Sequence, residues 1–241
     1  MCYTTDVYLT HEQIQKLEGR FNTNFDFDRY TPYHAVSAFE HPTLPVITNS
    51  PNGYSFQFFD WGLIPNWCKD WNKASEIRKF TPNAKSETVL DKPSFKDAIK
   101  SNRCLIPSLG FYEWQSRGKE KVPYYIYLKN KQPFFFAGIY DSWTNPDDKK
   151  THHTFSILTT EANPLMAEIH NIKKRMPVML SPENEHDWLN QEVNVFESVK
   201  LLQPYDQELM ATHTISPLIT SKHPDKNTIK VKEPFQHGLF G

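Results

Sequence analysis

The chain opens with MCYTTD, and Cys2 is its first side chain that could act as a nucleophile. Removal of Met1 by an aminopeptidase would leave Cys2 with a free α-amine beside its thiol. Such an amine titrates near pKa ~8 and a thiol near ~8.5, so a usable fraction of each is reactive at neutral pH. Together the two groups can condense with an aldehyde to form a five-membered thiazolidine. The position of Cys2 alone is weak support, because chance residues are common at a frayed terminus.

Two short motifs further along contain other polar candidates. PNAKSET contains Asn83, whose neutral amide can donate and accept hydrogen bonds without quenching a nucleophile. A Pro-Asn pair is also common in turns, and that interpretation stays open. In GFYEW, Glu113 stands among aromatic residues, where its pKa could rise enough for proton transfer at neutral pH. Strands also often turn a charged residue outward, so Glu113 by itself is only suggestive.

A histidine and two tryptophans complete the set of candidates. His170 ends the helix-like segment TEANPLMAEIH, a place where histidine is also common for helix-dipole reasons. Trp61 and Trp67 of WGLIPNW could stack unpaired bases, each stack contributing ~1 to 3 kcal/mol. Trp61 follows a strand pattern and is expected to be partly in the core, whereas Trp67 is expected in a loop.

Five segments resemble, in order, the motifs of the SRAP family, the abasic-site processing proteins also called SOS-response-associated peptidases: MCYT, WGLIPNW, PNAKSET, IPSLGFYEW and EIHNIKKRMPV. NAKSET followed by GFYEW is the most specific part. The resemblance implies covalent capture of abasic sites in single-stranded DNA through a thiazolidine at the N-terminal cysteine. It also implies four catalytic residues, namely Cys2, Asn83, Glu113 and His170. The residues that it implies for DNA binding are Trp61, Pro65, Trp67, Lys85, Ser86 and Arg175.

The chain departs from the family pattern at basic positions and in one loop. The family often begins Met-Cys-Gly-Arg and reads Asn-Ala-Arg, whereas this chain has Tyr3, Thr4 and Lys85. Lysine neutralises a phosphate but lacks the forked geometry of arginine. The loop after His170 is three residues longer than is common in the family. Its basic run, residues 173–175, could compensate for the lost arginines, although such runs are usually solvated loops.

The sequence is also consistent with two other functions. An N-terminal-nucleophile amidohydrolase or peptidase would also expose Cys2, but its thiol would attack an amide and its α-amine would serve as the base. A non-catalytic single-strand binder would need only aromatic platforms. NAKSET and GFYEW favour the abasic-site sensor, and a DNA complex that survives denaturation would separate it from both alternatives.

Composition limits the class of protein. The chain has 241 residues, of which 38% are hydrophobic and 14% aromatic, as in a folded domain with an aromatic-rich interior. A formal net charge of -1 provides no global basic field, so any nucleic-acid site must be a local patch. Cys2, Cys68 and Cys104 have no CxxC spacing, so neither a disulfide nor a zinc site is predicted. Cys68 and Cys104 are expected in the core.

Partners and location follow from the same features. No apolar run approaches the ~20 residues of a membrane span, and the chain lacks a signal sequence. We therefore expect no membrane contact and a cytoplasmic location, with association to the nucleoid during DNA repair. The expected partner is single-stranded DNA containing abasic sites. The expected state is a monomer without cofactor or metal.

The pattern of hydrophobic segments predicts an α+β fold, a single β-rich domain with a few helices packed around strands. Helices are predicted at residues 11–21, 92–100, 161–170 and 183–190. Strands are predicted in VITN, YSFQFFDWGLI, RCLIPSLGFYEW, YYIYL, FFFAGIY, TFSILTT and MPVML. The domain is placed at residues 1–220, and residues 221–241, which are polar and rich in lysine and proline, are expected to form a strap or tail.

Overall fold

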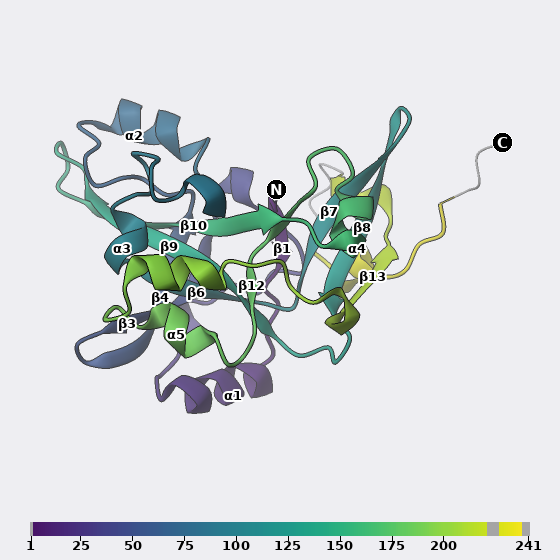
Figure 1. The fold of residues 1–241 in the computed structure, drawn as a ribbon, viewed down its shortest axis with the longest axis horizontal. Coiled ribbons are helices and arrows are strands. Elements are labelled where there is room, and N and C mark those ends of the chain that lie inside the picture. The colour runs from purple at the N-terminus through teal and green to yellow at the C-terminus, as the bar shows by residue number, and fades with distance from the viewer. Residues whose placement is uncertain (1, 221–226, 238–241) are drawn as a thin grey trace.

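The computed structural model describes residues 2–220 and 227–237, and its strands form two sheets flanked by short helices (Figure 1). The smaller sheet has the order β13 (Met210–Thr214), β8 (Glu120–Leu128), β7 (Gly110–Arg117), β1 (Thr4–Asp6) and β2 (Val36–Ser37). The larger sheet has the order β11 (Arg175–Pro177), β10 (Thr151–Glu161), β4 (Gly53–Trp61), β3 (Thr43–Ser50), β6 (Arg103–Ser108), β9 (Phe134–Thr144) and β12 (Met179–Leu180). Strand β5 (Asn83–Lys85) pairs in parallel with β10. The predicted α+β class is confirmed.

Short helices pack around these sheets (Figure 1). They are α1 (His11–Phe21), α2 (Trp71–Arg78), α3 (Ala98–Ser101), α4 (Pro164–Ile169), α5 (Glu185–Leu189) and α6 (Val195–Ser198). Helix α1 has the predicted bounds, because Thr10 and Gln13 form a reciprocal capping box at its start. The buried face of α1 consists of Ile14, Leu17 and Phe21, as its helical spacing predicts.

The other helices differ from the sequence prediction. Of the predicted 92–100, turns occupy the first part and α3 covers only the end. The predicted 161–170 begins too early, because Glu161 still pairs with Arg175 in the larger sheet and the helix starts only after the cap residue Asn163. Helix α5 is shorter than the predicted 183–190. Helices α2 and α6 and strands β1, β2, β5 and β13 were not predicted.

The segment RCLIPSLGFYEW, predicted as one strand, is two strands in different sheets. Strand β6 pairs with β3 and β9, whereas β7 pairs with β1 and β8. The chain crosses between the sheets at Leu109, whose N–H donates to the carbonyl of Asp6. This crossing brings Glu113 out of the larger sheet and beside the N-terminal strand.

Strand β1 is short but is held on every side. The Thr5 hydroxyl lies 2.8 Å from the Ser108 hydroxyl and donates to the Gly110 carbonyl at 3.0 Å. On the other side, the N–H of Ala38 donates to the Tyr3 carbonyl at 2.8 Å. These buried bonds fix the backbone directly after Cys2.

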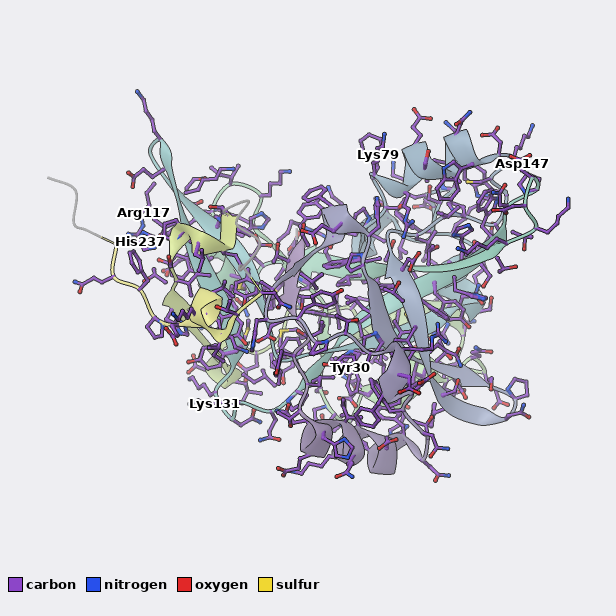
Figure 2. All side chains as sticks on the ribbon, turned by 180° about the vertical axis from the view of Figure 1, so that it is seen from behind. Tyr30, Lys79, Arg117, Lys131, Asp147 and His237 are labelled. Atoms are coloured by element: carbon purple, nitrogen blue, oxygen red, sulfur yellow. The ribbon has the colours of Figure 1, made fainter. Side chains whose placement is uncertain are left out.

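Residues 227–237 pack against the smaller sheet, and we call them the C-terminal strap. Lys232 forms an ion pair with the fully buried carboxylate of Asp6. Val231 is buried with Tyr112 and Tyr125, and the N–H of Phe235 donates to β13. The rest of the predicted 221–241 strap or tail, residues 221–226 and 238–241, lies outside the described residues. Figure 2 places Arg117 and His237 at one end of the molecule and Asp147 at the other.

The remaining cysteines are structural. Cys68 and Cys104 are buried free thiols, which confirms their predicted place in the core. Within residues 2–220 and 227–237, no helix is long and apolar enough to cross a membrane. The same residues contain no cluster of three or more His, Cys, Asp or Glu side chains that could hold a metal ion.

Candidate functional site

Cys2 and Asn83, far apart in the sequence, are in direct contact. The Asn83 Nδ2 group donates to the Cys2 carbonyl at 2.9 Å. The Asn83 Oδ1 atom is buried and accepts no hydrogen bond within the described part of the chain. Asn83 therefore holds the cysteine backbone with one atom and keeps a buried acceptor beside it with the other. The alternative interpretation of Asn83 as a turn residue is wrong, because it lies in strand β5.

Trp61 holds this asparagine in place and does not offer a surface to DNA. Its side chain is fully buried, and its Nε1 donates to the carbonyl of Pro82 at 2.9 Å. That carbonyl also accepts from the N–H of Ile157, so strand β5 is fixed from two directions. The prediction that Trp61 is a core residue is correct, whereas its predicted DNA contact is wrong because neither face of the ring is accessible.

Glu113 and His170 face each other at the same site. Glu113 Oε2 lies 4.0 Å from His170 Nε2, and both side chains are largely buried. Strand β7 carries Glu113, while His170 caps the end of α4, which packs against β7 (Figure 1). Helix α4 ends there because its next residues turn back towards β11.

The buried setting shifts the pKa of each acidic or basic group of the site. Burial raises the pKa of Glu113 to about 7, so the carboxyl is partly protonated at neutral pH. Burial lowers the pKa of His170 to about 4, so the imidazole is neutral there. Burial, together with the charge of Glu113, raises the pKa of the Cys2 thiol. The expected ordinary thiol pKa is therefore wrong, and the Cys2 thiol needs a base to ionise.

The hydrogen-bond distances of His170 favour one tautomer. Its Nδ1 lies 2.8 Å from the Arg175 carbonyl, closer than the 3.2 Å to the Arg175 N–H. The shorter contact favours a proton on Nδ1, donated to that carbonyl. Nε2 then faces Glu113 as an acceptor.

A cavity of about 430 Å³ opens over these groups. It is lined by Tyr3, Glu113, Trp114, Ser116, Lys121, His170, Ile172, Lys173 and Thr220. The antiparallel register pairs Thr5 with Phe111, and continuing it by two residues brings Tyr3 opposite Glu113. The residue next to Cys2 thus shares the cavity with both buried ionisable groups. Sequence reasoning missed Lys121 and Thr220, which belong to no motif.

The loop after His170, longer than the family pattern, is fastened to β7. The Asn171 side chain accepts from the Ser116 N–H at 3.0 Å and donates to the Ser116 carbonyl at 2.9 Å. Because both backbone groups of Ser116 are satisfied by one side chain, Asn171 occupies the edge of β7 beyond its pairing with β1. We call residues 171–174 the latched loop. Its tie to Ser116 also fixes the adjacent His170.

Arg175 is not free to bind a phosphate. Its guanidinium forms a forked ion pair with Glu87 of the KSET segment, and it donates to the Thr159 carbonyl at 2.7 Å. Glu87 thus already balances its charge, and the DNA contact predicted for Arg175 stays a prediction that this arrangement does not support. Lys85 is exposed and Ser86 is half-buried, so both remain candidates for DNA contact.

Pro65 and Trp67, both predicted to contact DNA, differ in exposure. Pro65 is buried, which contradicts its predicted place in a DNA groove. Trp67 is 44% exposed, and its predicted role remains open. A second exposed aromatic group was missed: Phe39 is 67% exposed and stacks on Tyr3 with ring centroids 4.9 Å apart. Phe39 lies outside every motif, and only its contact with Tyr3 connects it to the site.

A family model and several known proteins match this sequence. The family model "SOS response associated peptidase (SRAP)" matches residues 1–222. "Abasic site processing protein YoqW" of Bacillus subtilis (strain 168) is 37% identical over 203 residues, which cover 82% of this chain and 87% of that protein. "Abasic site processing protein HMCES" of Gallus gallus is 34% identical over 186 residues, which cover 68% of this chain and 54% of that protein.

Solved structures of other proteins have a similar fold. A protein from Bacteroides thetaiotaomicron matches with a TM-score of 0.89 and 36% identity over 98% of this chain and 100% of that chain. A protein from Bordetella bronchiseptica matches with a TM-score of 0.76 at 22% identity over 89% of this chain and 100% of that chain, and so shares the fold. With the family model covering the site and both sheets, the chain belongs to the SOS response associated peptidase (SRAP) family.

Proposed function

We propose that this protein captures abasic sites in single-stranded DNA by forming a thiazolidine with Cys2 after removal of Met1. One observation carries the proposal: the Cys2 backbone is held by Asn83 beside a cavity that contains Glu113 and His170. The names of the relatives, which are abasic site processing proteins, support the same substrate. An abasic sugar in its open form is an aldehyde, the group that an N-terminal cysteine can trap with two bonds.

The reaction balances with Glu113 as the only proton carrier. The α-amine adds to the aldehyde carbon, and one of the amine protons moves to the former carbonyl oxygen to give a hydroxyl. The protonated Glu113 carboxyl then donates a proton to this hydroxyl, which leaves as water. The carboxylate then takes the proton of the Cys2 thiol, and the thiolate closes the ring on the iminium carbon. The products are one thiazolidine, one water molecule and a protonated Glu113. A pKa of about 7 suits a group that must both donate and accept.

Asn83 and His170 support these steps without changing charge. Asn83 Oδ1 can accept a hydrogen bond from the α-amine of processed Cys2 and orient its lone pair. His170 stays neutral, so it does not stabilise the Glu113 carboxylate as a cation would. Nε2 of His170 can instead hold the sugar hydroxyl that leaves the ring on opening.

In this proposal, DNA enters the cavity as a single strand. Trp67 and the Tyr3–Phe39 stack provide exposed aromatic faces for unpaired bases, and Lys85 and Ser86 provide phosphate contacts. We further propose that the protein acts as a monomer in the cytoplasm, at the nucleoid during DNA repair. Lyase or peptidase chemistry would be additional to the cross-link.

The test distinguishes the contribution of the Cys2 α-amine from that of its thiol. Processed protein, protein that retains Met1, and a variant with one alanine inserted before Cys2 are incubated with an abasic single-stranded oligonucleotide and run on a denaturing gel. Intact mass first establishes the N-terminus of each sample. Only the processed protein should give an adduct that resists heat. An equal adduct from the Met1-retaining protein would contradict the proposal, and peptide cleavage without any DNA adduct would favour an amidohydrolase.

A further inference from the structure

The latched loop directs one of its two lysines into the cavity and the other away. Lys173 lines the cavity, whereas Lys174 does not and adopts a left-handed backbone with φ 48°. Both side chains are exposed. Within residues 2–220 and 227–237, Lys173 forms no ion pair. Its ammonium group is thus available to an anion that enters the cavity.

A second lysine reaches the same cavity from strand β8. Lys121 lines it and lies directly opposite Ser116 in the β7–β8 pairing. Ser116 is also the residue whose backbone is held by Asn171. Strand pairing therefore fixes Lys121, and the Asn171 latch fixes Lys173, relative to one backbone position. Two cations from separate elements are held at the mouth of one cavity.

The chemistry of the cavity defines the anion. Lys173 lies close enough to the buried pair for its charge to lower the pKa of both Glu113 and His170. In a nucleic acid strand, phosphodiesters flank each sugar on both sides. A sugar whose aldehyde carbon meets Cys2 therefore brings a phosphodiester on each side to the cavity that both lysines line.

We infer that Lys173 and Lys121 together bind one phosphodiester next to the abasic sugar, an inference that rests on the proposed function. The two point charges take the place of a forked guanidinium, since Arg175 is already paired with Glu87. The longer loop is what carries Lys173 to this position. Anchoring the phosphate there would hold the sugar over Glu113 and His170.

Reversible binding tests the two lysines without cross-linking. The probe is a single-stranded oligonucleotide with a tetrahydrofuran abasic analogue, which has no aldehyde, and its affinity is measured by fluorescence anisotropy at several salt concentrations. Lys173→Ala and Lys121→Ala should each reduce the slope of log K against log salt and weaken binding roughly threefold to tenfold, and the double variant should reduce the slope by about 0.7, as expected for one phosphodiester. The controls Lys174→Ala and Lys119→Ala, which alter exposed lysines outside the cavity, should keep the native slope. Circular dichroism checks that each variant is folded.

Two results would overturn the inference. One is a native salt slope in Lys173→Ala, and the other is an equal loss in Lys174→Ala, which would indicate only a diffuse positive field. A second measurement locates the phosphate: a neutral methylphosphonate replaces the linkage on one side of the abasic analogue or the other. When the methylphosphonate replaces the linkage that Lys173 contacts, the losses of affinity from Lys173→Ala and from the methylphosphonate should not add. Additive losses of affinity with the methylphosphonate on either side of the abasic analogue would also refute the contact.

Failure of the proposed function would be recognised separately. If processed protein forms no heat-stable adduct with an aldehyde-bearing abasic oligonucleotide, the thiazolidine proposal falls. The lysine contacts are read from reversible binding alone, so the two results cannot be confused.

Discussion

Nε2 of His170 lies 4.0 Å from Oε2 of Glu113, and the two side chains come from a helix end and a strand that are 57 positions apart in the sequence. Burial moves their pKa values in opposite directions, to about 4 for the histidine and about 7 for the glutamate. At neutral pH the pair is therefore a neutral imidazole facing a carboxyl that is about half protonated. This relationship gives Glu113 a proton to donate and His170 a lone pair to present.

Removal of the Glu113 carboxyl should slow cross-linking while sparing DNA binding. We expect Glu113→Gln to reduce the cross-linking rate by ~10² or more and to leave the affinity for the tetrahydrofuran oligonucleotide within about twofold. In native protein the rate should rise with pH as the α-amine deprotonates and fall above about pH 8, because little protonated Glu113 remains. In Glu113→Gln the alkaline fall should be absent. A native rate in the variant would remove Glu113 from the mechanism.

The same carboxyl should make stability depend on pH. The folded-state pKa of about 7 exceeds the ordinary value of 4.5, so the folded state holds the proton more tightly than the unfolded state. The stability that this provides is present below pH 4.5 and is lost as pH rises through about 7. Relative to native protein, Glu113→Gln should therefore gain up to about 3 kcal/mol between pH 5 and pH 8. Urea denaturation at the two pH values measures the difference, and a constant difference would mean that the carboxyl titrates normally.

Two tryptophans of WGLIPNW should behave in opposite ways. Trp61→Phe removes the hydrogen bond to Pro82 and part of a fully buried ring, and should lower the free energy of unfolding by about 1 to 3 kcal/mol. Trp67→Ala alters an exposed ring and should instead weaken single-strand binding about tenfold, with little change in stability. Denaturation and anisotropy on both variants give the comparison. Weaker binding by folded Trp61→Phe with native stability would restore its predicted DNA contact.

The exposed ring of Phe39 should act as a base platform. Phe39→Ala should weaken reversible binding of the abasic oligonucleotide about fivefold or more, because a base–aromatic stack contributes about 1 to 3 kcal/mol. Phe39→Trp should keep the native affinity. Phe196→Ala, which alters a ring of similar exposure on α6, serves as the control. Equal effects at Phe39 and Phe196 would argue against a specific platform.

The ion pair beneath β1 should matter for stability. Among the described residues, Lys232→Met leaves the fully buried Asp6 carboxylate with only the Tyr125 hydroxyl and the Tyr8 N–H as partners, and the change should cost about 3 to 5 kcal/mol. The double variant Asp6→Asn/Lys232→Met should recover part of that loss, because no buried charge remains unpaired. Urea denaturation of both variants measures the difference. A double variant less stable than Lys232→Met would contradict this account.

The sequence predicted elements whose signals are local and missed those that depend on distant partners. Helix α1 was predicted to the residue, because its cap and apolar stripe lie within its own segment. Strand β1 and strand β5 have no such signal, since three residues each become strands only by pairing with β7 and β10. RCLIPSLGFYEW was predicted as one strand because hydrophobicity does not mark the residue where a chain changes sheets.

The site shows the same division. The motifs identified Cys2, Asn83, Glu113 and His170, and the structure brings these four residues together. The strand pattern placed Trp61 partly in the core and Trp67 in a loop, as the structure has them, but the family resemblance still assigned both rings to DNA binding. The motifs also could not show that Glu87 pairs with Arg175 or that Asn171 bonds to Ser116 of β7, because each contact joins segments far apart in the chain.

The C-terminal strap has a consequence for how the protein is made. Asp6 and Lys232 are 226 residues apart, so β1 leaves the ribosome well before its cation has been synthesised. Until then the Asp6 carboxylate of the nascent chain has no counter-ion, and β1 lacks its contact with the C-terminal strap. Strand β1, which directly follows the nucleophile, therefore gains its counter-ion late in synthesis, and a ribosome that stalls before residue 232 leaves the strand without it.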